Sequence, residues 1–156
     1  MALDRSRLLA PSFEVAPLLL GSMLSIQSDA GVVRLRITEV EAYRGSVDPG
    51  SHAFRGKTNR NAVMFGEPGH LYTYFTYGMH TCANVVCGPE GQASGCLLRA
   101  GEIVEGIDLA RARRPLAKAD RDLARGPARL TVAAGITLAD GGCDLVSGRI
   151  RLELSG

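Results

Sequence analysis

The chain has 156 residues, of which 46% are hydrophobic and 22% charged, and this size and balance suit one globular domain with an adequate core. Its apolar runs are far shorter than the roughly 20 residues that span a bilayer, so we expect a cytoplasmic protein without a membrane partner. The net charge of +2 does not indicate a polyanion partner, and the four cysteines favour buried thiols in a reducing compartment.

Two elements are predicted in the first third of the chain. Between Leu8 and Leu24 the apolar clusters are interrupted by prolines, which predicts a short helix with Pro17 in its first turn and Gly21 at its end. Residues 32–43 alternate in a way that predicts a strand. With a period of two, one face carries Val33, Leu35, Ile37, Glu39, Glu41 and Tyr43. An apolar face that ends in carboxylates and a tyrosine indicates a strand that runs out of the core into a cleft.

The rest of the chain predicts a hairpin, further strands and helices. Residues 44–69 are rich in Gly, Pro, Asn, Ser and Asp and are expected to form a long functional loop. Strands at 71–75 and 79–87 flank a compact turn with Tyr77 near its tip. The later elements are a strand at 95–100, helices at 105–113 and 126–134, and one or two strands within 143–154. We therefore predict a single α+β domain with a mixed, mostly antiparallel sheet, flanking helices and a protruding hairpin.

The most informative feature is a cluster of rings: every tyrosine and histidine lies between Tyr43 and His80. A nucleobase held outside a duplex needs flat stacking surfaces, and these rings can supply them. Glu41 could deprotonate a water, and Arg99 could hold that water or a phosphate. Tyr77, at a hairpin tip, could wedge between base pairs and fill the gap left by an extruded nucleotide.

Each of these residues also has a plainer interpretation. Tyr77 could fold back onto its own hairpin, and Asn84 could tie two strands together rather than recognise a base. Glu39 and Glu41 could be strand carboxylates paired with nearby arginines, for which the candidates are Arg34, Arg36 and Arg60. The basic tract between Arg111 and Arg129 could face phosphates or be a solvated helical surface.

Many short motifs occur in a distinctive order and spacing: Glu39-Val-Glu-Ala-Tyr43, His52, Thr58-Asn-Arg-Asn61, Met64-Phe65, Gly69-His-Leu-Tyr-Thr-Tyr74, Tyr77-Gly-Met79, Asn84, Leu97-Leu-Arg-Ala100, Glu105-Gly106 and Gly126-Pro127. Together they resemble the alkyladenine (3-methyladenine) DNA glycosylases, and the resemblance runs from about residue 8 to about residue 145. It implies a monofunctional base-excision repair enzyme that flips alkylated or deaminated purines out of duplex DNA. Such an enzyme hydrolyses the N-glycosidic bond, leaves an abasic site, and uses no metal or cofactor.

The resemblance also assigns roles to residues. Glu41 resembles the general base, and Arg99 resembles the residue that helps to hold the water. The base pocket would be formed by Tyr43, His52, Tyr74 and Asn84, of which Asn84 disfavours guanine. The residues that would enter the DNA are Tyr77 as the wedge, with Met79 and His80 beside it, so the predicted hairpin becomes a DNA-inserting one.

The expected partner is duplex DNA with damaged purines, and the expected state is a monomer with one glycosylase domain over residues 1–156. The chain ends at Gly156, so we expect the family's C-terminal strand region, which helps to position the water, to be missing. A non-catalytic damaged-DNA-binding protein is the main alternative. A third hypothesis is a metal-bound nucleic-acid module that uses His80, Cys82 and Cys87, although their spacing matches no standard zinc pattern.

Overall fold

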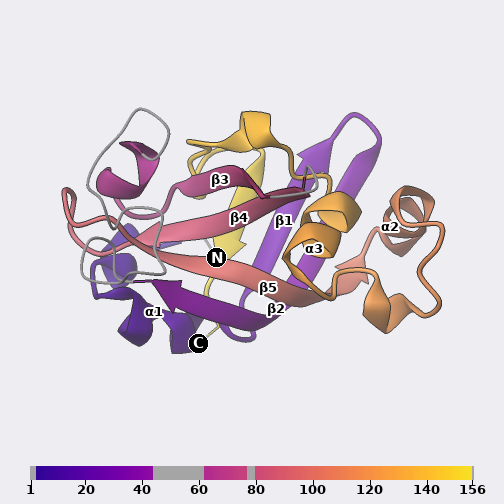
Figure 1. Cartoon of the computed structure of the whole chain (residues 1–156), viewed down its shortest axis with the longest axis horizontal. Helices are drawn as coiled ribbons and strands as arrows, with labels where there is room; N and C mark the ends of the chain where they lie inside the picture. The colour runs from indigo at the N-terminus through magenta and orange to yellow at the C-terminus, as the bar shows by residue number, and fades with distance from the viewer. Residues whose placement is uncertain (1–2, 44–61, 77–79, 156) are drawn as a thin grey trace.

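The computed structural model describes residues 3–43, 62–76 and 80–155, which form one antiparallel sheet with helices packed against it (Figure 1). The strand order is β3-β4-β5-β2-β1-β6. The strands are β1 (Met23–Ser28), β2 (Gly31–Tyr43), β3 (Leu71–Thr76), β4 (His80–Cys87), β5 (Ser94–Glu105) and β6 (Ile150–Glu153). The α-helices are α1 (Ser12–Leu19), α2 (Ile107–Arg113) and α3 (Pro127–Ala134), and the short 3₁₀ helices are η1 (Arg5–Leu8), η3 (Ala62–Phe65), η4 (Asp120–Asp122) and η5 (Leu138–Asp140). The predicted α+β class is confirmed.

The sheet curls until its two edges approach each other through residues 142–145. On one side of this segment, the amide of Leu71 in β3 donates to the carbonyl of Cys143 at 2.9 Å. On the other side, the amide of Leu152 in β6 donates to the carbonyl of Leu145 at 3.0 Å. The concave side holds the main core, to which every strand contributes buried apolar side chains and to which α1 and α3 add theirs. Each fully buried Leu or Val contributes about 1.5–3 kcal/mol, so this cluster is the main source of stability.

Most of the predicted elements are present, with two corrections near the N-terminus. Helix α1 begins at Ser12, directly after Pro11, so Pro17 lies inside the helix and its predicted first-turn position is wrong. The helix tolerates the lost amide because Val15 and Leu19 are fully buried. Strand β1 was not predicted, although Leu24 and Ile26 alternate with polar residues and are buried. Among the described residues, no helix is long and apolar enough to cross a bilayer.

The predicted strand that carries Glu41 and Tyr43 is present as β2, but its face assignment is wrong. Its pairing with β5 shifts three times, between Arg34 and Leu35, between Ile37 and Glu39, and between Glu39 and Val40. The second shift leaves an extra residue in β2 and the third leaves Arg99 as an extra residue in β5, so Val40 returns to the register of Ile37. Val40 packs against the core with Ile37, although they are three residues apart. The alternation of inward and outward side chains therefore shifts by one residue between Ile37 and Val40. As a result, the side chain of Glu41 points to the face of the sheet opposite the core.

Candidate active site

One row of side chains crosses four strands on the convex face of the sheet. Tyr72 in β3 pairs with Asn84 in β4, Asn84 pairs with Leu97 in β5, and Leu97 pairs with Glu41 in β2. Directly opposite residues in an antiparallel ladder point to the same face. The register thus places Glu41 and Asn84, two residues predicted from the sequence, on either side of Leu97. Sequence reasoning missed Leu97, which lies between them, and Tyr72, which lies on the far side of Asn84; both are buried and form the floor of this row.

Glu41 is held by donors from two strands. The hydroxyl of Tyr43 donates to Oε1 of Glu41, and Nη1 of Arg99 donates to Oε2. The hydrogen bond with Glu41 and its negative charge raise the pKa of Arg99, so the guanidinium remains charged. The side chains of Arg99 and Glu41 are 47% and 38% exposed, which leaves this ion pair open to solvent and to a ligand.

The arginines near Glu39 and Glu41 in the sequence have other carboxylate partners. Arg36 pairs with Glu102 at 2.7 Å, and Arg34 lies 3.9 Å from both Glu105 and Glu153, so the ion pair of Glu41 is with Arg99 instead. Arg60 lies outside the described residues. Glu39 stands at the register shift and lines a separate hollow of about 560 Å³ with Thr38, Ala100, Gly101, Glu102, Arg121 and Arg125. Only Glu41 of the two is therefore placed with Tyr43.

Tyr74 lies on the same face of the sheet as Tyr43 and Tyr72. It pairs with Cys82 across β3 and β4, and its ring lies 5.7 Å from that of Tyr72, tilted by 34°. Burial, then the neighbouring Cys82, and then Tyr43 and Tyr72 raise the pKa of Tyr74. Burial likewise raises the pKa of Cys82. Both groups are therefore protonated and uncharged at neutral pH, which keeps this part of the face suited to an aromatic ligand.

Asn84 ties two strands together and still lies on the site face. Its Nδ2 donates to the carbonyl of Tyr72 at 3.4 Å, and the residue is 3% exposed. This contact bears out the interpretation of Asn84 as a link between β3 and β4, and it fixes the amide in orientation.

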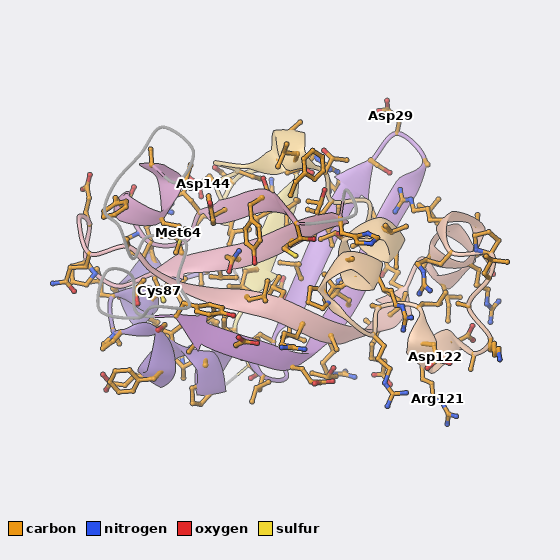
Figure 2. The ribbon with its side chains drawn as sticks, viewed as in Figure 1. Asp29, Met64, Cys87, Arg121, Asp122 and Asp144 are labelled. Atoms are coloured by element: carbon orange, nitrogen blue, oxygen red, sulfur yellow. The ribbon has the colours of Figure 1, made fainter. Side chains whose placement is uncertain are left out.

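A small second cluster closes one end of the site face. Met64 of η3 is buried with Tyr72, Val86 and Ala93, and Figure 2 shows Met64 over the sheet at the end away from Arg121. Gly95 lies under it, between Val86 and Tyr43 in the next cross-strand row. A Cβ at Gly95 would approach Met64 Cε to 3.3 Å. The absence of a side chain at Gly95 lets η3 pack closely against the sheet. The sequence alone did not indicate this role for Gly95.

Helix α3 closes the other end because β4 and β5 separate. Their pairing ends at Asn84 and Leu97, and residues 124–126 then take the place beside β5. The amide of Gly126 donates to the carbonyl of Arg99 at 2.8 Å, so α3 begins next to Arg99. The hydroxyl of Thr131 in α3 donates to the carbonyl of Thr81 in β4 at 2.8 Å. The helix is thus anchored to both of the separated strands.

The structure sorts the basic tract into groups with different roles. Arg111 pairs with Asp108 and Asp120, and Arg114 donates to the carbonyls of Asp122 and Leu123. Arg113 donates to the carbonyl of Ala133. In contrast, Arg129 at the start of α3 is exposed and pairs with none of the described residues. The tract is therefore neither wholly structural nor wholly available for phosphates.

Several predicted site residues lie outside the description. His52, Tyr77 and Met79 are among residues 44–61 and 77–79, so the pocket wall and the wedge assigned to them stay predictions. His80 begins β4 and is exposed, next to the predicted tip of the hairpin.

The residues proposed for a metal module do not converge. Cys82 pairs with Tyr74 on the convex face, whereas Cys87 lies in the core on the opposite face of β4. Within the described residues, no group of three His, Cys, Asp or Glu side chains is placed to hold a metal ion. All four cysteines are free thiols, and three of them are buried.

One face of the curled antiparallel sheet thus carries Glu41, Arg99, Asn84 and a pair of tyrosines. A model of the family described as methylpurine-DNA glycosylase (MPG) matches residues 6–156. The chain therefore belongs to the methylpurine-DNA glycosylase family.

Relatives agree with this assignment. A protein of Leifsonia xyli is 65% identical over 148 residues, which cover 92% of this chain and 70% of the relative. Relatives from Streptomyces avermitilis and Burkholderia cenocepacia are 58% and 57% identical and cover 91% and 87% of this chain, and 67% and 64% of their own lengths. All three carry the provisional name 3-methyladenine DNA glycosylase. The chain spans about two thirds of the length of the relatives it matches.

Proposed function

We propose that this chain is a DNA glycosylase that removes alkylated purines, with 3-methyladenine as the first substrate to test. The observation that carries the proposal is the exposed Glu41–Arg99 pair on a face of the sheet that also carries Tyr43, Tyr74 and the buried Asn84. The family supplies the reaction class, and the names of the relatives supply the lesion.

The chemistry assigned to this face is hydrolysis of the N-glycosidic bond. Glu41 accepts a proton from a water as the water oxygen bonds to C1′ of the deoxyribose. The bond from C1′ to the purine nitrogen breaks, and its electron pair leaves with the base, which a methylated, positively charged purine accepts without a further proton. Arg99 holds the water or the adjacent phosphate while Tyr43 and Tyr74 stack on the base.

The DNA-bound state extends beyond the described face. We assign to Tyr77 the wedge that fills the duplex after the purine turns out, to Met79 and His80 contacts beside it, and to His52 a further wall of the pocket. Deaminated purines belong to the same proposal as a second class of lesion. Arg129 is exposed in α3, the helix that begins next to Arg99, and we assign to it a contact with a phosphate of the bound strand.

The proposal is tested by replacing the base while keeping its shape. Glu41→Gln should lower single-turnover release of 3-methyladenine from a lesion duplex by at least about 100-fold, because general-base catalysis typically contributes that much. The same variant should still bind a duplex that carries an abasic site. The assay measures free base and alkali-sensitive sites on the strand.

A matched control is Glu102→Gln, the same change in an exposed glutamate of β5 that pairs with Arg36. It should release base at the parental rate. If Glu41→Gln also released base at that rate, Glu41 would not be the base. If the parent chain bound lesion duplexes tightly but produced no abasic sites, the non-catalytic damage-binding alternative would replace the proposal.

A further inference from the structure

Tyr43 contacts the carboxylate that the proposed reaction uses as its base. Its hydroxyl donates to Oε1 of Glu41, while Arg99 donates to Oε2. We propose that Tyr43 is a positioning residue for Glu41, in addition to forming a wall for the base. This inference rests on the proposed function, in which Glu41 takes the proton of the water.

The carboxylate of Glu41 needs a positioning residue because its terminal torsion angle, χ3, is only weakly restrained. Rotation about the bond that carries a glutamate carboxyl group has a broad, roughly two-fold profile, so the side chain does not fix its own oxygens. Two donors from different strands, one on each oxygen of Glu41, remove this freedom. A lone pair of the Glu41 carboxylate would then point toward the water. This orientation matters because even a small misplacement of a catalytic group lowers the rate strongly.

The backbone holds Tyr43 itself in place. It is the last residue of β2, pairs with Gly95, and its carbonyl accepts from Oγ of Ser94 at 3.4 Å. Residues two apart in a strand point to the same face and are separated by about 6.6 Å, a span that a phenol can cross. The hydroxyl therefore reaches Glu41 from a ring that can still stack on a base.

The other titratable groups around Glu41 differ from Tyr43 in what their removal would change. Among the described residues these include Arg99, which contacts Glu41, Glu39, which acts on Arg99, and Tyr74, which interacts with Tyr43 and Cys82. Arg99 and Glu39 carry charge, and Glu39 acts on Arg99. Burial raises the pKa of both Tyr74 and Cys82, which keeps them neutral. Tyr43→Phe removes a hydrogen bond to Glu41 without altering charge and without removing the stacking ring.

The experiment compares Tyr43→Phe with Tyr74→Phe. The second variant also loses a hydroxyl on this face of the sheet, but that hydroxyl interacts with Cys82. Glutamate side chains are labelled with ¹³C, and the Glu41 carboxyl resonance is assigned by its loss in Glu41→Gln. The free protein is titrated, and single-turnover base release is measured against pH. Thermal unfolding and affinity for an abasic duplex report on folding and on the pocket.

Tyr43→Phe should move the Glu41 titration and the acid limb of the rate profile upward by about one pH unit, since a carboxylate that loses a donor is more readily protonated. It should lower the maximal rate about tenfold, with affinity for the abasic duplex changed less than threefold. Tyr74→Phe should leave both titrations at the parental pH, whatever it does to the rate.

Two outcomes would overturn the inference. If Glu41 and the rate titrated in Tyr43→Phe at the same pH as in the parent, Tyr43 would be only a wall of the pocket and not a positioning residue. Equal shifts in both variants would indicate general loosening of this face. Failure of the proposed function is recognised separately: if Glu41→Gln released base normally, catalysis would be reassigned, while the NMR titration would still decide whether Tyr43 orients Glu41.

Discussion

Two of the arginine–carboxylate pairs among the described residues, Arg149–Asp140 and Arg99–Glu41, have the same chemistry and different surroundings. Arg149 forms a two-pronged contact with Asp140, with Nε at 2.8 Å from Oδ1 and Nη2 at 2.6 Å from Oδ2. Its remaining donors reach the carbonyls of Gln27 and Gly135 at 2.7 and 2.8 Å. The guanidinium thus joins β1, the end of α3 and η5. Asp140 is only 10% exposed.

The Arg99–Glu41 pair is built in the opposite way. Arg99 uses one nitrogen on one oxygen of Glu41, and both side chains are more than a third exposed. The described residues give the rest of its guanidinium no side-chain partner. A pair in which all three guanidinium nitrogens are bonded to the fold stabilises it, whereas a pair that leaves nitrogens facing solvent can bind a water or a phosphate.

The largest effect on this comparison is expected from Arg99→Lys. Lysine keeps the charge but loses the planar donors, so base release should fall roughly 10- to 100-fold, as for loss of a transition-state donor. The free energy of unfolding should change by less than about 0.5 kcal/mol because the pair is exposed. Single-turnover kinetics and urea unfolding measure the two quantities. A large loss of stability with parental kinetics would make Arg99 a structural residue.

Arg149→Lys should show the reverse pattern. We expect the free energy of unfolding to fall by about 2 kcal/mol, since a partly buried carboxylate and two carbonyls lose their donors. Base release per folded molecule should stay parental. Arg36→Lys, in the exposed pair with Glu102, is the matched control and should cost less than about 0.5 kcal/mol. Equal losses in Arg149→Lys and Arg36→Lys would contradict the structural role.

The smallest effect concerns an arginine without a described carboxylate partner. Arg129→Gln should weaken binding to a lesion duplex and reduce the slope of log K against log salt by about 1, as expected for one lost phosphate contact. Arg111→Gln is the control, because Asp108 and Asp120 already neutralise Arg111. Binding is measured by fluorescence anisotropy over a salt series. An unchanged slope for Arg129→Gln would remove α3 from the DNA interface.

Local pattern predicted the elements that carry the site. Alternation predicted β2 with Glu41 and Tyr43, and the spacing around Tyr77 predicted the strands observed as β3 and β4. Pro127 and Gly135 predicted the bounds of α3 closely. The residues alone indicated Arg99 as a group that could hold the water or a phosphate, and the family resemblance implies a similar role. The loop and hairpin tip that carry His52 and Tyr77 lie outside the described residues, so their assignments stay predictions.

The errors arise where long-range pairing overrides local pattern. A strict period of two put Glu41 on the face of Ile37, but the paired shifts in β2 and β5 turn it to the other face. Gly101 makes room at this point, since a Cβ there would lie 2.7 Å from Leu35 Cδ1. No short window of the sequence contains that information, because β2 ends at Tyr43 and β5 begins only at Ser94, with β3 and β4 between them.

By itself, the sequence determined which residues can do the chemistry and which short elements carry them, because propensity, alternation and helix-end signals act between near neighbours. Only the tertiary structure decided that Arg99 and Tyr43 hold opposite oxygens of Glu41, and that Tyr72 and Leu97 form the floor. Those relations depend on the register between strands far apart in the chain. The register is set by how the curled sheet buries its core.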